Sequence, residues 1–513
     1  MIEDFGKWGL KKINKRIIGL VFVLLLQLLL VFSFLVYVSF NNDNLRMVLY
    51  LINIFVMVKV IYRHENSAYK LAWIIIILVL PFVGGLVYLL FAERKIPKVL
   101  RNKVIVSTLK SNMNIDKNDI ETIGDEDIKD IYEYINHNGL YPYYRNTESE
   151  YFDSGEAFFE SLLSKLKKAK YFVFIEFYII RDGYMLNTLI ESLSDCVKRG
   201  VKVYMIYDDV GSIIGLSKKT IQRIKEYGIE IVAFSPITIR LSLLSLANNR
   251  SHHKIVVIDN YYGYTGGFNL SDEYINHVKP YGHWKDTGIM IKGEATYSLT
   301  AMFINFYNAC VKEEKRLVYD DFRIKNKAVI NDAYILAFSS SPNEDENLGR
   351  MTHLNIIKHA KKYLYIQTPY LVIDSEVTNA LCMAAKSGVD VIITTPHIPD
   401  KKIVFEVTKS HYQTLLEAGV KIYEYSPGFM HSKLMISDDK IAMIGTINLD
   451  YRSYYLNYED AILIANDLEV IKMKEDYQKT LNVSKQISLY DEYKTKYIIR
   501  LMRAILNVFA LLL

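Results

Sequence analysis

Two stretches of the sequence repeat each other: SHHKIVVIDNYYGYTGGFNL at residues 251–270 and MHSKLMISDDKIAMIGTINL at residues 430–449. Five residue types recur in the same order, each 179 residues after its first occurrence. The pairs are His252 and His431, Lys254 and Lys433, Asp259 and Asp438, Gly266 and Gly445, and Asn269 and Asn448. Five coincidences at one offset favour an internal duplication. We therefore predict a body made of two similar halves.

The residues around both stretches alternate apolar β-type runs with longer helical patterns. A helix is predicted at residues 154–170, and buried strands are predicted at 171–180, 201–209 and 254–259 and again at 363–372, 389–396, 420–425 and 433–438. Alternating strands and helices imply an α/β layer architecture. Hydrophobic residues make up 51% of the chain, which excludes a disordered or collagen-like protein.

In each copy the histidine and the lysine stand two residues apart at the start of a predicted strand. Because alternate residues of a strand project from one face, both side chains face the same way. His253 then points in the opposite direction, which argues against a histidine pair on one metal ion and favours packing or hydrogen bonding. Asp259 and Asp438 are grouped with the candidate catalytic residues. They end their strands before turn-forming residues, so a role in fixing the hairpin is slightly favoured over substrate contact.

Two such half-sites facing one another would place two imidazoles, two ammonium groups and two asparagine amides around one cavity. Phosphoryl chemistry without a metal needs a nucleophile, a proton donor opposite it and fixed positive charge. Histidine suits the first two roles because its ordinary pKa is about 6.5. We therefore predict no metal ion and no cofactor. The cysteines, Cys196, Cys310 and Cys382, are too widely spaced for a zinc ribbon or a disulfide framework.

Two weaker signals lie outside the repeated motif. Glu176 stands alone in an apolar strand and is costly to bury unpaired, so it is expected to face the site or to meet a cation. Asp208, Asp209 and Gly211 follow a predicted strand, where they either line the entrance to the site or form a turn.

The first fifth of the chain predicts a membrane region. Apolar stretches at residues 17–40, 47–62 and 71–92 are interpreted as transmembrane helices, although Lys59 interrupts the middle one. Residues 1–110 hold 15 basic and 5 acidic side chains, whereas the rest of the chain holds 47 and 52, so a body that wraps nucleic acid is disfavoured. Residues 490–513 predict an amphipathic helix at a membrane surface. The face of the membrane on which the body lies stays open.

The pattern of His, any residue, Lys, four residues, Asp, six residues, Gly-Gly or Gly-Thr and then Asn resembles the phospholipase D superfamily in both copies. The resemblance to bacterial cardiolipin synthases is closer and runs from about residue 50 to residue 465, through IEFYIIRDG, MIYDDVGS, HWKDTG and IQTPYLVIDSEVTNAL. It implies two duplicated phospholipase D-like α/β/α sandwich halves that form one active site, preceded by transmembrane helices in a multi-pass protein of a bacterial cell membrane. The corresponding boundaries are 1–100 for the membrane region, 101–145 for a linker, 146–330 and 331–485 for the two halves, and 486–513 for the C-terminal membrane-associated helix.

The resemblance also implies a ping-pong transfer of a phosphatidyl group between two phosphatidylglycerol molecules, giving cardiolipin and glycerol. His252 would form a phosphatidyl-histidine and His431 would protonate the leaving glycerol, although the motifs are so alike that either imidazole could attack. The residues expected to hold phosphate oxygens are Lys254, Lys433, Asn269 and Asn448, and the carboxylates expected to orient the imidazoles are Asp286 and Glu459, one after each motif. Membrane lipid is the expected partner, nucleic acid is not, and a homo-oligomer is allowed. A phospholipase D-like hydrolase that uses water as the acceptor stays the alternative.

Overall fold

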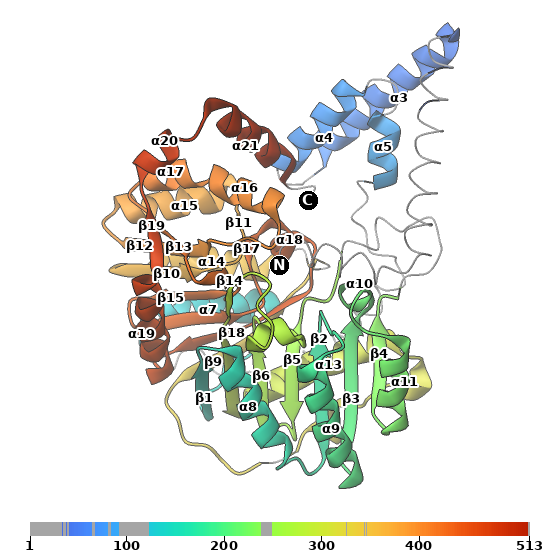
Figure 1. Cartoon of the computed structure of the whole chain (residues 1–513), viewed down its shortest axis with the longest axis vertical. Helices are drawn as coiled ribbons and strands as arrows, with labels where there is room; N and C mark the ends of the chain where they lie inside the picture. The colour runs from blue at the N-terminus through green and yellow to red at the C-terminus, as the bar shows by residue number, and fades with distance from the viewer. Residues whose placement is uncertain are drawn as a thin grey trace. The chain divides into compact units, whose positions relative to one another are not determined.

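The structure, a computed structural model, describes residues 33, 37, 41–63, 67–80, 84–91, 123–236, 249–324, 326–342, 344 and 346–510. The chain divides into two compact units. We call Met1–Lys95 with Leu501–Leu513 the helical unit, and Ile96–Arg500 the body. Figure 1 labels the helices and strands of each, coloured along the chain.

Three helices of the helical unit pack against one another: α3 (Asp43–Tyr62), α4 (Ser67–Val79) and α5 (Gly84–Phe91). The side chain of Asn53 in α3 accepts a hydrogen bond from the N–H of Gly85 at 2.8 Å. A Cβ at Gly85 would lie 2.4 Å from the same amide oxygen, so glycine is what allows this approach. The rings of Trp73 and Tyr88 meet edge to face at 5.2 Å.

The prediction of three membrane spans is not supported. Among the described residues, α3 is the one helix with the length and composition to cross a membrane. The predicted span at residues 17–40 lies almost entirely outside the described residues. The predicted span at 71–92 is wrong as a single helix, because α4 ends at Val79 and α5 begins at Gly84. The 13 residues of α4 rise only about 20 Å, and the sequence before α5 carries Pro81, which has no N–H to continue a helix.

The first half of the body is a seven-stranded sheet with the order β1-β8-β6-β5-β2-β3-β4. The strands β2, β3 and β4 are parallel, and the remaining neighbours pair antiparallel. The strands are β1 (Thr147–Phe152), β2 (Phe172–Phe177), β3 (Lys202–Asp208), β4 (Glu230–Phe234), β5 (Lys254–Ile258), β6 (Tyr262–Gly266) and β8 (Gly288–Gly293). The helices are α7 (Glu126–Gly139), which precedes the sheet, and α8 (Gly155–Leu166), α9 (Tyr184–Lys198), α10 (Asp209–Ser212), α11 (Lys218–Glu226) and α13 (Thr296–Cys310).

The second half is an eight-stranded sheet with the order β19-β13-β12-β10-β15-β16-β18-β9. The strands are β9 (Tyr334–Ser340), β10 (Tyr363–Gln367), β12 (Asp390–Pro396), β13 (Lys421–Tyr425), β15 (Leu434–Ser437), β16 (Ile441–Gly445), β18 (Glu459–Ala465) and β19 (Ser484–Ile487). The helices are α14 (Leu348–His359), α15 (Ser375–Lys386), α16 (Lys402–Ser410), α17 (Tyr412–Glu417), α18 (Tyr451–Tyr455), α19 (Leu468–Asn482) and α20 (Leu489–Tyr493), and α21 (Tyr497–Phe509) follows.

The two sheets share one topology, which confirms the predicted duplication and the α/β class. The order β1-β8-β6-β5-β2-β3-β4 of the first half is matched by β9-β18-β16-β15-β10-β12-β13 in the second. The parallel and antiparallel pairings agree at every step, with β10, β12 and β13 parallel like β2, β3 and β4. The motif strands β5 and β15 therefore occupy the same central place in their sheets.

The two halves share one apolar core and meet again near the motifs. Helix α13 contacts strands of both sheets, β5 in one and β9 in the other, and Phe303 of this helix stacks on Phe174 of β2 at 4.3 Å. Two short pairings then join the halves: β7 (His283–Lys285) runs parallel to β14 (Gly428–Met430), and Ser251 pairs with Tyr458. Because these pairings flank both motif histidines, they bring the two motifs together.

Candidate active site

Each motif histidine is held by a backbone hydrogen bond to a strand of the other half. The N–H of His252 donates to the carbonyl of Tyr458 at 2.8 Å, and the N–H of His431 donates to the carbonyl of Lys285 at 2.7 Å. Both carbonyls belong to the residue just before a predicted orienting carboxylate. Both histidines are buried, with 8% of His252 and 7% of His431 exposed.

The two orienting carboxylates are exchanged between the halves. Nδ1 of His252 lies 2.7 Å from a carboxylate oxygen of Glu459, in the second half. Nδ1 of His431 lies 2.6 Å from a carboxylate oxygen of Asp286, in the first half. The structure therefore brings both predicted carboxylates to the imidazoles, in a pairing that the order of the motifs does not reveal. Contact through Nδ1 keeps Nε2 of each ring away from its carboxylate, although Nε2 of His431 lies 3.2 Å from Nζ of Lys433.

The two histidine–carboxylate pairs differ in protonation. Burial lowers the pKa of His252 to about 4 although Glu459 opposes it, and burial together with Lys433 holds the pKa of His431 well below its usual value. Burial raises the pKa of Asp286 to about 7. Burial acts in the same direction on Glu459, but His252, Lys254 and a hydrogen bond from Thr446 together outweigh it and that pKa is lowered. The surroundings thus favour the protonated form of Asp286 and the ionised form of Glu459.

The motif lysines lie beside the imidazoles. Nζ of Lys254 donates to the carbonyl of His252 at 2.9 Å, and Nζ of Lys433 lies 2.9 Å from Nδ1 of His431 and contacts its carbonyl. Burial lowers the pKa of Lys254 to about 8 and that of Lys433 to about 7, against the pull of nearby carboxylates. Two buried cations close to two imidazoles make a place for an anion, since a bound anion would favour their charged form.

The motif asparagines are engaged in local hydrogen bonds. The amide oxygen of Asn269 accepts from the N–H of Ile179 at 3.1 Å, and its NH₂ donates to the hydroxyl of Tyr274 at 2.6 Å. Asn448 donates to Asp450 at 3.0 Å. Each NH₂ keeps a second hydrogen for another acceptor. Within the described part of the chain, no group of three His, Cys, Asp or Glu side chains is placed to hold a metal ion.

Asp259 and Asp438 are not brought to the imidazoles, and grouping them with the catalytic residues is corrected here. Each follows the last residue of its strand, whereas the histidine precedes the first. Asp259 accepts three backbone hydrogen bonds, from residues 170–172, at 2.8 to 2.9 Å, and Asp438 accepts three from residues 361–363 at 2.7 to 2.9 Å. Both have positive φ angles, of 55° and 57°. The alternative that they fix the hairpin therefore fits the structure.

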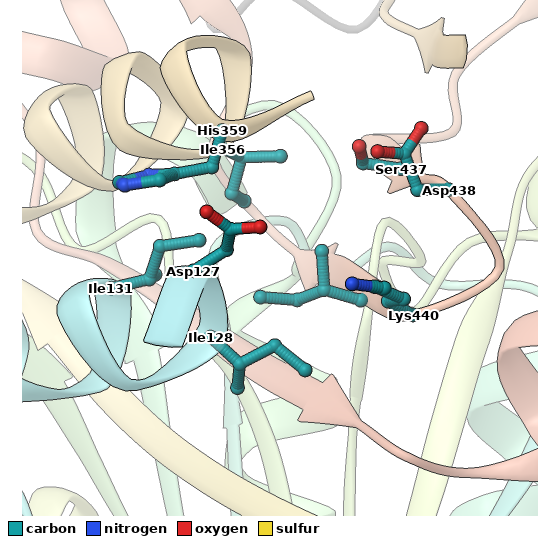
Figure 2. Close-up of a pocket in the computed structure, with 9 residues that line it drawn as sticks. Asp127, Ile128, Ile131, Ile356, His359, Ser437, Asp438 and Lys440 are labelled. Carbon is teal, nitrogen blue, oxygen red and sulfur yellow. The ribbon is translucent and has the colours of Figure 1, made fainter. Parts of the chain in front are cut away.

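A pocket lies at this far end of β15 and not at the imidazoles. Figure 2 shows Asp438 at its edge, opposite His359 of α14 and Asp127 of α7. The pocket's lining residues are Asp127, Ile128, Ile131, Ile356, His359, Ser437, Asp438, Lys440 and Ile441. None of them belongs to the histidine–carboxylate pairs, so this hollow is separate from the site described above.

Several neighbours of the imidazoles were not singled out from the sequence. The rings of Trp284, Tyr274 and Phe429 lie 5.1, 5.3 and 5.8 Å from that of His431, and Tyr178 meets His252 edge to face at 5.2 Å. The HWKDTG stretch already linked one of these rings to Asp286. Tyr178 lies in the strand predicted at residues 171–180, but nothing in that pattern linked its ring to His252.

Buried ion pairs support the segment that leads into the first motif. Asp208 caps α10 through the N–H groups of Val210 and Gly211, and it also contacts the guanidinium of Arg250 at 2.9 Å. Turn formation therefore describes this aspartate better than a place at the entrance. Glu176 lies 3.4 Å from Nδ1 of His253, and this carboxylate raises the pKa of His253 against the effect of burial.

Two sheets of one topology, each contributing a histidine and a lysine to a shared site, define a phospholipase D-like protein. A family model described as "Cardiolipin synthase, PLD-like domain" matches residues 162–301 and 353–482, and one described as "Phospholipase_D-nuclease N-terminal" matches residues 51–93. The chain belongs to the cardiolipin synthase family and is a phosphatidyltransferase.

Individual relatives agree with this placement. The chain is 31% identical to a cardiolipin synthase of Alkalihalophilus pseudofirmus over 457 residues, 88% of this chain and 90% of the relative. It is 31% identical to a cardiolipin synthase of Staphylococcus aureus over 461 residues, 86% of this chain and 90% of the relative. The crystal structure of the phosphatidylserine synthase of Haemophilus influenzae shares the fold, with a TM-score of 0.57 and 14% identity, over 75% of this chain and 100% of that one.

Proposed function

We propose that this phosphatidyltransferase moves a phosphatidyl group from one phosphatidylglycerol to another, giving cardiolipin and glycerol through a phosphatidyl-histidine. The observation that carries the proposal is the pair of imidazoles held through Nδ1 by carboxylates of opposite halves, at 2.7 and 2.6 Å. This arrangement leaves two Nε2 atoms for a nucleophile and a proton carrier.

The first step uses the difference between the two pairs. Glu459 has a lowered pKa, and an ionised carboxylate can only accept a hydrogen bond, so the proton of neutral His252 sits on Nδ1 and Nε2 carries a lone pair. Nε2 attacks phosphorus, the bond from phosphorus to the glycerol oxygen breaks, and that oxygen takes a proton from the His431–Asp286 pair. The extra proton held by this pair supports its role as the acid.

The second step returns the enzyme to its starting state. The hydroxyl of a second phosphatidylglycerol gives its proton to His431 and attacks phosphorus, and the bond from phosphorus to Nε2 of His252 breaks. Lys254 and Lys433 stabilise the negative oxygens in both steps, because they are buried cations beside the reacting rings. The free NH₂ hydrogens of Asn269 and Asn448 are proposed as further donors to those oxygens.

Lipid substrates place the reaction at a membrane, and two helices support this location. Helix α3 has the length and composition of a span. Helix α21 exposes Ile498, Leu501 and Ile505, while Arg500 and Lys496 lie close by in the sequence. Apolar side chains flanked by basic ones suit the boundary between acyl chains and anionic head groups. We propose that α3 anchors the chain and that α21 lies at the membrane surface.

The decisive experiment follows isotope-labelled phosphatidylglycerol in vesicles with the purified full-length chain. Mass spectrometry should find cardiolipin that carries label from two donor molecules, together with free glycerol in equal amount. Phosphatidic acid as the main lipid product would instead show that water is the acceptor, and the enzyme would then be a hydrolase. A His252→Ala variant should form neither product, because no phosphatidyl adduct can form.

A further inference from the structure

The two half-sites differ on the side of the strand that faces away from the motif lysines. Glu176 of β2 pairs with Ile255 of β5, one residue beyond the motif lysine. Gln367 of β10 pairs with Leu434 of β15, again one residue beyond the motif lysine. The two side chains therefore occupy equivalent places, and one is a carboxylate where the other is an amide.

Two more equivalent positions repeat this contrast. Between the histidine and the lysine stands His253 in the first motif and Ser432 in the second. Directly after the orienting carboxylate stands Asp460 beside the first motif and Thr287 beside the second. Near His252 all three positions carry ionisable side chains, whereas near His431 all three carry neutral ones. We call Glu176, His253 and Asp460 the rear group.

The rear group holds the first motif through direct contacts. Glu176 accepts a hydrogen bond from the hydroxyl of Ser251 at 2.6 Å and lies 3.4 Å from Nδ1 of His253. Asp460 accepts from the N–H of Lys254 at 3.0 Å. These contacts fall on Ser251, just before His252, and on His253 and Lys254, just after it, and the members of the rear group are all at least nine-tenths buried.

The second motif has a neutral counterpart to this support. The hydroxyls of Thr287 and Ser432 share a hydrogen bond of 2.6 Å. The amide of Gln367 is buried, and neither its oxygen nor its nitrogen has a hydrogen-bond partner among the described residues. In the described part of the chain, the one carboxylate with a hydrogen bond to this motif histidine is Asp286, in front of the strand.

We propose that Glu176 and Asp460, with His253 between them, are positioning residues that make the imidazole of His252 the more basic of the two and so select it as the attacking group. The inference rests on the proposed function, which needs one nucleophile and one proton carrier. Above about pH 6, where Asp460 is ionised, two buried carboxylates against one histidine leave the rear group with an excess of negative charge, which favours the protonated form of the nearby ring.

The charged groups in front of the two rings are similar but not identical. Each ring has one carboxylate on Nδ1, while Nζ of Lys433 contacts the ring of His431 and Nζ of Lys254 contacts the backbone carbonyl of His252. Asp208 and Arg250, near the first motif, form a buried pair with little net charge. The groups that face the rings are Glu459, Lys254 and Lys433 for His252, and Lys433, Lys254, His252, Lys401 and Asp286 for His431. Lys401 adds positive charge near His431, which disfavours the imidazolium form of that ring. The lack of rear carboxylates behind His431 acts in the same direction.

The test replaces each rear carboxylate by its amide and follows the pH dependence of glycerol release in a single turnover from phosphatidylglycerol vesicles. Attack requires neutral His252, so the acid limb of the profile reports its pKa. The basic limb reports loss of the proton from the His431–Asp286 pair together with loss of charge from Lys433 and Lys254. Glu176→Gln removes negative charge behind His252, which disfavours the imidazolium and lowers its pKa. The acid limb should shift to lower pH by about half a unit to one unit, the plateau rate should fall, and the basic limb should stay in place.

Asp460→Asn provides the second variant. Because burial raises the pKa of Asp460 to about 6, its carboxyl group is already protonated at the acid limb, so this variant should leave that limb in place and lower the rate only at higher pH. Glu148→Gln removes an exposed carboxylate of β1, paired with Lys292 at 2.7 Å, and should move neither limb. Glutamine already stands at the equivalent place in the second half, so Glu176→Gln is compatible with the fold, and thermal melting checks this. A folded Glu176→Gln variant whose acid limb coincides with that of the unmodified enzyme, or whose two limbs move together, would overturn the proposal. Absence of glycerol release from the unmodified enzyme would instead contradict the proposed function, so the two failures are distinguishable.

Discussion

Replacing Asp286 by asparagine tests the exchange of carboxylates between the halves. The carboxylate lies 2.6 Å from Nδ1 of His431, and both groups are buried. A hydrogen bond to a charged group contributes about 1.5 to 3 kcal/mol, so its loss in the transition state corresponds to a decrease in kcat of roughly 10- to 150-fold. KM should change little, because the variant removes an orienting group rather than a cation that holds the phosphate.

The assay separates proton donation from attack through the leaving group. A phosphatidyl ester of p-nitrophenol releases a weakly basic phenolate that needs no proton, so the Asp286→Asn variant should recover most of its rate of product release with this substrate. Glu459→Gln, the matched variant, weakens the orientation of His252 and should stay slow with both substrates. The opposite pattern, with Glu459→Gln rescued and Asp286→Asn not, would refute either the exchange or the assignment of the attacking imidazole.

Three further predictions address stability, charge and metal. Asp438→Ala removes the acceptor of three backbone N–H groups and should lower the free energy of unfolding by about 2 to 3 kcal/mol, measured by chemical denaturation. Activity per folded molecule should be largely kept. A fully folded variant without activity would contradict the role of Asp438 in fixing the hairpin. Activity should fall as pH rises through about 7 to 8, because Lys433 and Lys254 lose their charge and Asp286 loses its proton. A kcat/KM value that stays constant from pH 6 to 9 would argue against this. Because the two lysines supply the positive charge, activity should survive a strong chelator, and restoration of a lost rate by added zinc would speak for a metal mechanism instead.

The sequence was sufficient for the parts of the fold that depend on local pattern. The five recurring pairs predicted the duplication, and the apolar runs predicted the motif strands, because the period of a strand is readable from its own residues. The spacing of His252 and Lys254 likewise placed both on one side of β5. The position of Glu176 in an apolar strand indicated a buried partner, because a carboxylate is costly to bury alone.

Other features depend on which distant segments contact each other, and the local sequence pattern did not predict them. Which carboxylate serves which imidazole depends on the pairing of β7 with β14 and of Ser251 with Tyr458, and neither has a signal in the order of the motifs. The stretch at 71–92 is apolar throughout, so hydropathy alone did not show that α4 ends at Val79. The rear group was not predicted, because it is recognised only by comparing equivalent positions of the two halves. Glu176 must be compared with Gln367, 191 positions further on, and His253 with Ser432, 179 positions further on.

The exchange of carboxylates has a consequence for the history of the chain. One half alone contains a motif histidine, but the carboxylate that contacts this histidine lies in the other half. A single ancestral copy could therefore have worked only as a symmetric dimer of identical chains. Such a pair has two interchangeable histidines, so the sequence alone cannot fix which of them attacks and which carries the proton. Fusion of two copies into one chain lifts that restriction, because a residue such as Glu176 can then change in one copy while Gln367 stands in the other. The tandem arrangement is thus what permits a division of labour between two rings that began as the same residue.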